Sequence, residues 1–451
     1  MSSIGDTTAD PSELPGEVTT EAYRKRFQIR LIVVLVAGML LDGYILGIIG
    51  PITSTIEHEV AGMTTAWIGL EAASALIGIM IGSPIGGWLA DKLGRKPLLF
   101  WDVSLFTIAS AAQFFVETPT ELFLVRLAMG IAVGVEYAVG WPLLAEFAPA
   151  HLRGRLLGCT IIAWYLGFCV AFVVGYYLDQ AGVSWNIILG TSTPIAILIL
   201  LGRIGLPESP RWLWSKGRTA DAKGIVGRYL DTDYMTDMVK AKSGGPAGSF
   251  AMLFSPSIWR STVFMAGFWA CAVTPYFAIA TFANDLLTGF GLTGLLGGIS
   301  LSVFALIGVI VTTLIVDKVR RRTLTVPTQW IAGALLVIIG LWAGAPPVVM
   351  LLLFLAFSFV NAMYNVMTTV YPSEVFPTEV RGIGTGFSAA VSRLGAAAGL
   401  FLIPISLEHL GFSTTMFIAA VIAFAGAALS QVLAPETGGK SLSEMAENFS
   451  H

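Results

Sequence analysis

The segment Gly87-Trp-Leu-Ala-Asp-Lys-Leu-Gly-Arg-Lys96 follows a long apolar run and combines two glycines with an acid and three basic residues. A related segment, Asp317-Lys-Val-Arg-Arg-Arg322, follows another apolar run in the second half of the chain. The two aspartates are 226 positions apart (317 − 91). Similarity at one long offset indicates that the chain contains two copies of a structural unit.

Two further motifs recur at nearly the same offset. Glu146-x-x-Pro-x-x-x-Arg-Gly154 returns as Glu374-x-x-Pro-x-x-x-Arg-Gly382, 228 positions later (374 − 146). Pro207-Glu-Ser209 returns as Pro435-Glu-Thr437, also 228 positions later (435 − 207). Each half is therefore expected to be one copy of a six-helix unit, as in many transporters.

The composition predicts that these units lie in a membrane. The 451 residues are 55% hydrophobic and 12% charged, with a mean hydropathy of +0.78, whereas a soluble domain carries about 25% charged residues. Apolar runs of about 20 residues predict membrane-spanning helices. Twelve such runs lie near 31–53, 65–89, 97–116, 121–146, 155–178, 185–205, 259–287, 293–316, 324–343, 347–371, 383–406 and 412–433.

These runs predict an all-α membrane protein with twelve transmembrane helices in two pseudo-symmetric six-helix bundles. The predicted parts are a disordered N-terminal tail, two bundles, a loop between them and a C-terminal tail: 1–27, 28–206, 207–255, 256–434 and 435–451. The N-terminal tail is polar and acidic and lacks an apolar core, which argues against a cleaved signal peptide.

Loop charges predict the orientation. Lys and Arg gather in the loops on one side, for example Lys92, Arg95 and Lys96, whereas the opposite loops contain acids and histidines but no Lys or Arg. The positive-inside rule then places both termini and the central loop in the cytoplasm. The expected location is a bacterial-type inner membrane.

The sequence argues against an enzyme or a primary pump. Its three cysteines lie inside apolar runs, and the sequence has no metal-binding cluster, nucleophile elbow, phosphate-binding glycine loop or ATP-binding domain. No cofactor and no nucleic-acid partner are expected. The expected partners are a small-molecule substrate, protons and the lipid bilayer, and the expected functional unit is a monomer.

From about residue 25 to 445 the chain resembles the major facilitator superfamily, and within it the sugar porter clan together with the aromatic acid:proton symporters and the synaptic-vesicle-glycoprotein-like transporters. The matching stretches are Asp91–Lys96, Arg126-x-x-x-Gly130, Glu146–Gly154, Pro207-Glu-Ser-Pro-Arg-Trp-Leu213, Tyr371-Pro-Ser-Glu-Val-Phe-Pro377, Arg381-Gly382 and Pro435–Thr437. The resemblance implies alternating access between two six-helix bundles around a central substrate.

The chain also departs from sugar porters. They carry amide side chains in the fifth and seventh spans, where this chain has Trp164-Tyr165 and Trp269-Ala-Cys-Ala-Val-Thr-Pro-Tyr276. Asp42-Gly43-Tyr44 is instead similar to the first span of the acid symporters. Proton-coupled symport of an organic acid is therefore the leading prediction; a sugar, polyol or cationic solute, an uncoupled facilitator and a nutrient sensor remain alternatives.

Ionisable residues within spans predict the proton-coupling site, because a charge in a bilayer is costly and is therefore a candidate for a functional role. Asp42 and Glu136 are the candidate proton carriers, and either one could act. Arg126, on the span of Glu136, is expected to tune the carrier, and the resemblance implies that it pairs with an acid of the first span. The alternative is a static ion pair that only fixes helix packing. Glu71 is expected in an outer vestibule.

The predicted substrate site combines one cation with polar and aromatic side chains. Arg393 is expected to hold a substrate carboxylate, although it could pair with an acid of the protein instead. A polar stripe on one helical face is expected to face the cavity: Asn361, Tyr364, Asn365 and Thr368. Aromatic candidates for the cavity wall are Trp164, Trp269 and Tyr276.

The repeated motifs predict a cytoplasmic gate, in which acids and arginines of the two halves pair in one state and separate in the other. The alternative is that these charges only fix the topology. The candidate gate residues are Gly87, Asp91, Gly94, Arg95, Glu146, Arg153, Glu208, Arg211, Asp317, Arg321, Glu374 and Arg381.

Overall fold

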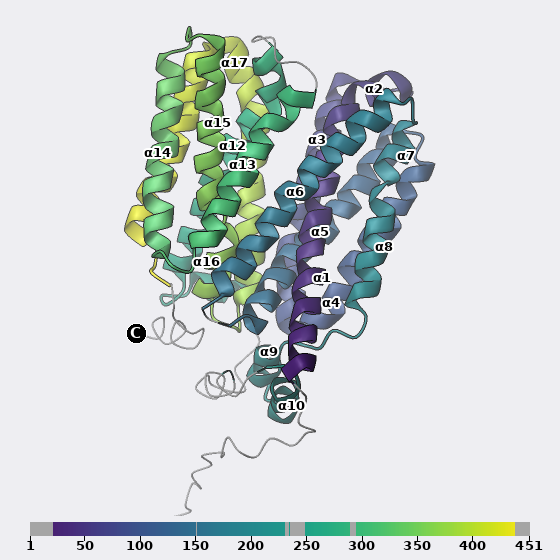
Figure 1. Ribbon diagram of the computed structural model, residues 1–451, viewed down its shortest axis with the longest axis vertical. Coiled ribbons are helices and arrows are strands. Elements are labelled where there is room, and N and C mark those ends of the chain that lie inside the picture. Colours follow the sequence, from purple (N-terminus) through teal and green to yellow (C-terminus); the bar gives the residue numbers. More distant parts are fainter. Residues whose placement is uncertain (1–20, 150, 231–233, 235–248, 289–294, 438–451) are drawn as a thin grey trace, which may run out of the picture.

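The computed structural model describes residues 21–149, 151–230, 234, 249–288 and 295–437. Every element in these ranges is helical, and the long helices form two groups that stand side by side (Figure 1). This arrangement confirms the predicted fold class. Residues 1–20 of the predicted N-terminal tail, most of the loop between 231 and 248, and residues 438–451 lie outside the described residues.

The first group contains the first six predicted spans, and its sixth span is broken at Thr191. Its elements are α1 (Glu21–Gly47), η1 (Gly50–Ile52), α2 (Thr53–Glu59), α3 (Thr65–Leu93), α4 (Arg95–Ala112), η2 (Gln113–Phe115), α5 (Pro119–Phe147), α6 (Arg153–Gln180), α7 (Trp185–Gly190) and α8 (Ser192–Arg203). Thr118 and Glu121 begin α5 with a reciprocal capping box, in which each side chain accepts from the other residue's backbone N–H.

The second group contains the remaining spans, and two of its features differ from simple rods. The tenth span is divided at Val366, and a single 53-residue helix contains the last two spans with a break at Gly411, whose φ is 80°. The elements are α12 (Trp259–Thr288), α13 (Leu295–Ile315), α14 (Arg321–Leu341), α15 (Pro347–Asn365), α16 (Met367–Val375) and α17 (Arg381–Leu433).

The helices have the length and surface of membrane spans. In the described residues, nine helical segments are long and apolar enough to cross a membrane, and Ile299–Ile315 is a shorter apolar helix. Large apolar side chains point outward on both groups; Phe115 is 83% exposed and Val432 is 77% exposed. Helices that are apolar on all sides suit a lipid environment.

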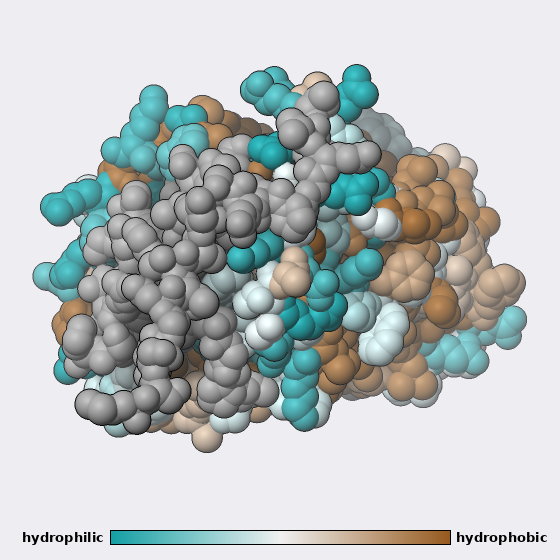
Figure 2. Space-filling view, turned by 90° about the horizontal axis from the view of Figure 1, so that it is seen from below, coloured by the Kyte–Doolittle hydropathy of each residue, from teal (hydrophilic) through white to brown (hydrophobic). Residues whose placement is uncertain are grey.

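Short helices cover one end of the molecule. These are α9 (Pro210–Ser215) and α10 (Thr219–Tyr229), which lie at the bottom of Figure 1, together with η3 (Phe250–Phe254) from the same connection. We call this end the central-helix end. Helix α1 extends to it, where the ring of Phe27 lies 4.0 Å from the ring of Tyr229 and Arg24 donates to the carbonyl of Gly227. Seen from this end, hydrophilic side chains gather on the face and hydrophobic ones on the flank (Figure 2).

Glycines hold α3 and α5 in direct backbone contact within the first group. A Cβ on Gly78 would lie 2.3 Å from the carbonyl oxygen of Leu127, and one on Gly130 would lie 2.3 Å from that of Ala75. The stripes around these glycines therefore pack two helices of the same bundle. This pair carries Glu136 as well as Asp91 and Glu146, so it connects the middle of the bundle to the central-helix end.

Candidate functional site

A cavity lined mainly by aromatic side chains lies between the two groups of helices. Its walls come from α5 and α6 on one side and from α12, α15, α16 and α17 on the other. The lining residues are Tyr137, Trp141, Ile161, Trp164, Tyr165, Trp269, Val273, Tyr276, Phe277, Asn365, Thr368 and Arg393. Both bundles contribute, so relative movement of the bundles would change the shape of this central cavity.

Arg393 is the charged residue of the central cavity wall. It is 5% exposed, and its guanidinium lies 5.5 Å from the ring of Tyr137 and 5.8 Å from the ring of Phe277. Its Nε has no hydrogen-bond partner among the described residues. The rings stabilise the cation by cation–π attraction, but they leave donors free for an anion that enters the cavity.

The polar stripe of the tenth span is only half in the cavity. Asn365 and Thr368 line it, at the point where α15 gives way to α16. The side-chain amide of Asn361 donates to the carbonyl of Ala272 (3.2 Å) and is hydrogen-bonded to the Tyr364 hydroxyl. The prediction that all four side chains face the cavity therefore needs correction: Asn361 and Tyr364 stabilise the packing of the second bundle, because the helix break turns only the end of the stripe toward the cavity.

The three predicted aromatic residues all line the cavity, and further rings join them. The ring centroids of Trp269 and Trp141 are 5.6 Å apart, and those of Tyr276 and Tyr165 are 6.0 Å apart. Each pair joins one bundle to the other. Tyr137 and Trp141 were not among the predicted cavity residues, although they follow Glu136 on the same helix. Their spacing of four residues was the available signal, since it places both rings on one helical face.

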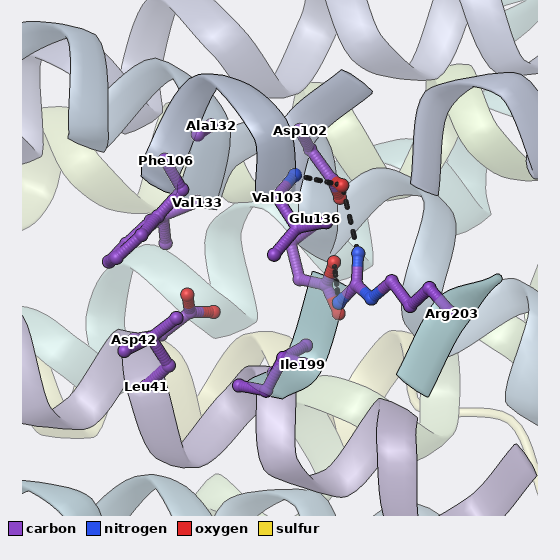
Figure 3. Close-up of a pocket in the computed structure, with 11 residues that line it drawn as sticks. Leu41, Asp42, Asp102, Val103, Phe106, Ala132, Val133, Glu136, Ile199 and Arg203 are labelled. Carbon is purple, nitrogen blue, oxygen red and sulfur yellow. Dashed lines mark hydrogen bonds and ion pairs between the residues drawn. The ribbon is translucent and has the colours of Figure 1, made fainter. Parts of the chain in front are cut away.

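A second cavity lies inside the first bundle and holds three acids and one arginine (Figure 3). Arg203 of α8 reaches Asp102 of α4 at 2.8 Å and Glu136 of α5 at 2.7 Å. Asp42 of α1 lies across this cavity, and its Oδ2 has no hydrogen-bond partner among the described residues. We call this group the acidic cavity. The remaining lining is Gly38 with apolar side chains: Leu41, Val103, Phe106, Ala132, Val133 and Ile199.

The structure changes the predicted partner of Glu136. Asp102 and Arg203 did not appear among the predicted site residues, although both lie within predicted spans and so carried the signal of a buried charge. Arg126 interacts electrostatically with Glu71 of α3 instead of tuning the acids of the acidic cavity. The expectation that Arg126 pairs with a first-span acid is therefore corrected. Arg126 lies about three helical turns along α5 from Glu136, which lines the acidic cavity together with Asp42 of the first span.

The twelve predicted gate residues gather at the central-helix end. Glu146, at the end of α5, accepts from Arg381 at the start of α17 (2.7 Å), and both side chains are at most 1% exposed. The hydroxyl of Ser209 also donates to Glu146. Arg95 lies 3.7 Å from Glu146 and 3.1 Å from Asp91. These contacts join the first bundle to the second through buried charges.

Asp91 and Gly87 bring the backbones of the two bundles together. The carboxylate of Asp91 accepts from the N–H groups of Gly382 (3.3 Å) and Ile383 (2.9 Å), so it caps the positive N-terminal end of α17. A Cβ on Gly87 would lie 2.2 Å from the carbonyl oxygen of Gly382. Only glycine permits this approach of α3 to α17.

The second copy of each motif makes the corresponding contacts, now from the second bundle to the first. Asp317 accepts from the N–H groups of Gly154 (3.0 Å) and Arg155 (2.9 Å) at the start of α6. Arg321 lies 3.1 Å from Asp317 and 3.4 Å from Glu374, and Arg153 is attracted electrostatically to Glu374. The repeated motifs therefore meet across the boundary between the bundles.

The remaining gate residues anchor the short helices. Glu208 accepts from the backbone N–H groups of Arg95 (2.8 Å) and Lys96 (3.1 Å), next to Gly94, whose φ is 101°. The guanidinium of Arg211 lies 5.1 Å from the ring of Tyr234, whose hydroxyl donates to the carbonyl of Glu146. Burial raises the pKa of Tyr234 to about 12, so this hydroxyl stays protonated at neutral pH. This structure is thus closed at the central-helix end.

The described residues contain no group of three or more His, Cys, Asp and Glu side chains that could hold a metal ion. The site instead consists of a cavity between two bundles, a buried charge cluster beside it and a closed network at one end. This combination suits binding and release of a solute.

Comparisons with known proteins agree with this architecture. The profile of the family described as "Sugar (and other) transporter" matches residues 31–449. The chain is 35% identical over 421 residues to the inner membrane metabolite transport protein YgcS of Escherichia coli, covering 91% of this chain and 92% of that protein. It is 30% identical to the putative metabolite transport protein YaaU of the same organism, with 90% and 92% covered.

A solved structure shares the fold. The chain matches the major facilitator superfamily proton:xylose symporter XylE bound to 6-bromo-6-deoxy-D-glucose with a TM-score of 0.80 and 22% identity, covering 95% of this chain and 100% of that one. These similarities extend over nearly the whole chain, and they concern transporters and not enzymes. The chain belongs to the sugar (and other) transporter family, and it has the fold of a major facilitator superfamily transporter.

Proposed function

We propose that this protein moves a small organic anion across the membrane together with a proton, by alternating access to the central cavity. The observation that supports an anion is Arg393, a buried cation in the cavity wall whose Nε has no partner among the described residues. A buried charge without a hydrogen-bonded counter-ion in direct contact is costly. A carboxylate can bind a guanidinium through two parallel hydrogen bonds, which offsets that cost.

The cavity lining favours an organic acid over a sugar. Besides Arg393, its polar groups are the amide of Asn365, the hydroxyl of Thr368, the tyrosine hydroxyls and the tryptophan N–H groups. A sugar carries no charge that could neutralise Arg393, whereas a carboxylate does. XylE is described as a proton:xylose symporter, so a sugar is the alternative substrate that the experiment must include.

Proton coupling is proposed from the buried acids beside the central cavity. Asp42 and Glu136 lie in the acidic cavity, and Asp42 interacts electrostatically with both Arg203 and Arg393. The proton affinity of these acids would therefore depend on whether an anion neutralises Arg393. We further propose a monomer in a bacterial-type inner membrane with both termini in the cytoplasm, as the basic loops indicate.

The gate residues would then operate the closed end in this cycle. Their ion pairs and helix caps join the bundles when the central-helix end is closed, and they would separate when the cavity opens to that side. This assignment rests on the contacts of Glu146 with Arg381 and of Asp91 with the start of α17.

Transport into proteoliposomes tests the proposal. We would measure uptake of monocarboxylates, sugars and cationic amines at two external pH values, with and without an imposed proton gradient. The expected result is accumulation of a carboxylate driven by an inward proton gradient. Arg393→Gln should abolish binding of the carboxylate, whereas Arg260→Gln, at an exposed arginine that also lies over a ring, should have no effect. Carboxylate transport that survives Arg393→Gln in a folded protein would contradict the anion site.

A further inference from the structure

The acidic cavity contains more negative charge than its arginine can balance. Asp42, Asp102 and Glu136 are each at most 4% exposed, and Arg203 is the cation that contacts two of them. Three ionised carboxylates and one guanidinium would leave a net charge of −2 (1 − 3) among apolar side chains. Such an uncompensated charge is costly in a bilayer, and protonation of a carboxyl group is the least expensive remedy.

The geometry points to a shared proton-binding site formed by Asp102 and Glu136 on Arg203, with Asp102 as its unpredicted member. This inference rests on the proposed proton coupling and identifies where the proton is held. Arg203 binds one oxygen of each acid, at 2.8 Å for Asp102 and 2.7 Å for Glu136. The other oxygens, Asp102 Oδ2 and Glu136 Oε1, have no hydrogen-bond donor among the described residues.

Because both carboxyl groups bind the same guanidinium, they are also close neighbours of each other. Two ionised carboxylates only accept hydrogen bonds, so a bond between them needs one proton. Arg203 then balances the single remaining charge of the pair. One proton thus satisfies both acids, and this explains why the side chains can be buried together.

Helix packing restricts the site to these groups. A Cβ on Gly38 of α1 would lie 2.6 Å from Glu136 Oε1 and 2.7 Å from the Arg203 guanidinium, so α1 covers the pair closely. The other ionisable groups that face it are Asp42 on α1, Tyr137 on α5 and, through Asp42 and Tyr137, Arg393 on α17.

The position of this pair links it to the central cavity. Tyr137 follows Glu136 directly on α5, and its ring lines the central cavity 5.5 Å from the Arg393 guanidinium. Glu136, which would bind the proton, and Tyr137, whose ring lies beside the Arg393 guanidinium, are therefore adjacent residues of α5. Loss of the proton would restore the charge of the pair and change the interaction of Glu136 with Arg203, α4 and α8.

The test separates proton-driven accumulation from exchange. Asp102→Asn and Glu136→Gln keep the shape of the protonated acids, and so they mimic a site that never releases its proton. For both variants we expect loss of accumulation driven by an inward proton gradient. Exchange of external for internal labelled carboxylate should continue and should no longer vary with pH. The matched control is Asp179→Asn, an acid on α6 that accepts from Thr55 outside the acidic cavity, and it should behave like the wild type.

Infrared difference spectroscopy gives a readout independent of transport. The wild type should show one protonated-carboxyl band that disappears on raising the pH, and each single variant should lack it, because the proton belongs to the pair. Wild-type accumulation in Asp102→Asn, or a titrating band that persists in both variants, would overturn the shared site. Absence of proton-driven accumulation in the wild type would instead refute the proposed function itself.

Discussion

Replacement of Glu146 by Gln should open the central-helix end. In the closed structure Glu146 accepts from Arg381 of the other bundle at 2.7 Å and lies 3.7 Å from Arg95, with both its partners buried. Breaking a buried ion pair costs about 3–5 kcal/mol. Gln can still accept one hydrogen bond, so we expect the low end, about 3 kcal/mol. Since every 1.4 kcal/mol is a factor of ten, the open-to-closed ratio should rise roughly a hundredfold.

Distances between spin labels on opposite bundles would measure this change. Cysteines at Leu93 and Lys318 are suitable because both positions are exposed and each lies within a repeated motif at the central-helix end. The native cysteines would first be replaced by serine: Cys159, Cys169 and Cys271. In detergent, Glu146→Gln should move the distance distribution toward the longer, open-state population.

An exposed ion pair supplies the control. Arg218 and Asp221 are 2.8 Å apart, but their side chains are 58% and 55% exposed. Asp221→Asn should leave the distance distribution unchanged, since exposed pairs contribute only about 0–1 kcal/mol. If Glu146→Gln is folded and retains the wild-type distribution, the reasoning that this buried pair closes the end is refuted.

Three other changes test separate parts of the structure. Arg393→Lys keeps the charge but loses the planar pair of donors, so carboxylate affinity measured by tryptophan fluorescence should fall about ten- to a hundredfold; unchanged affinity would contradict two-point binding. Gly87→Val places a side chain against the Gly382 carbonyl, where a Cβ would lie at 2.2 Å, and should destabilise the closed state by about 1–3 kcal/mol, seen as longer label distances. Asp317→Asn removes the charge that accepts from the Gly154 N–H and should weaken closure by about 1–2 kcal/mol, less than Glu146→Gln does. Equal effects of the two substitutions on the label distances would contradict this expectation.

Much of the charge network at the central-helix end could be predicted because its motifs are local and repeated. Asp91 and Asp317 follow corresponding spans, and both cap a helix of the opposite bundle in the structure. Similarly, Glu208 and Glu436 cap the starts of α4 and α14, although only Glu208 was among the predicted gate residues. A carboxylate at a helix N-terminus is favourable wherever it occurs, so copies of one motif lead to copies of one contact.

The cavities were less predictable because each depends on how several helices are rotated. A span that is apolar on all sides gives little signal of which face points inward. The stripe from Asn361 to Thr368 therefore predicted a cavity face, yet Asn361 donates within the second bundle while Asn365 lines the cavity. The break between α15 and α16 produces this difference.

The sequence by itself determined the class of the molecule: apolar runs long enough to span a bilayer, basic loops on one side and a duplicated set of motifs. These features depend only on length, composition and order along the chain. Only the tertiary structure decided which buried charges meet. Arg203 joins Asp102 and Glu136 from three separate helices, whereas Arg126 interacts with Glu71. Sequence separation does not predict such contacts, because they are set by the packing of side chains between helices.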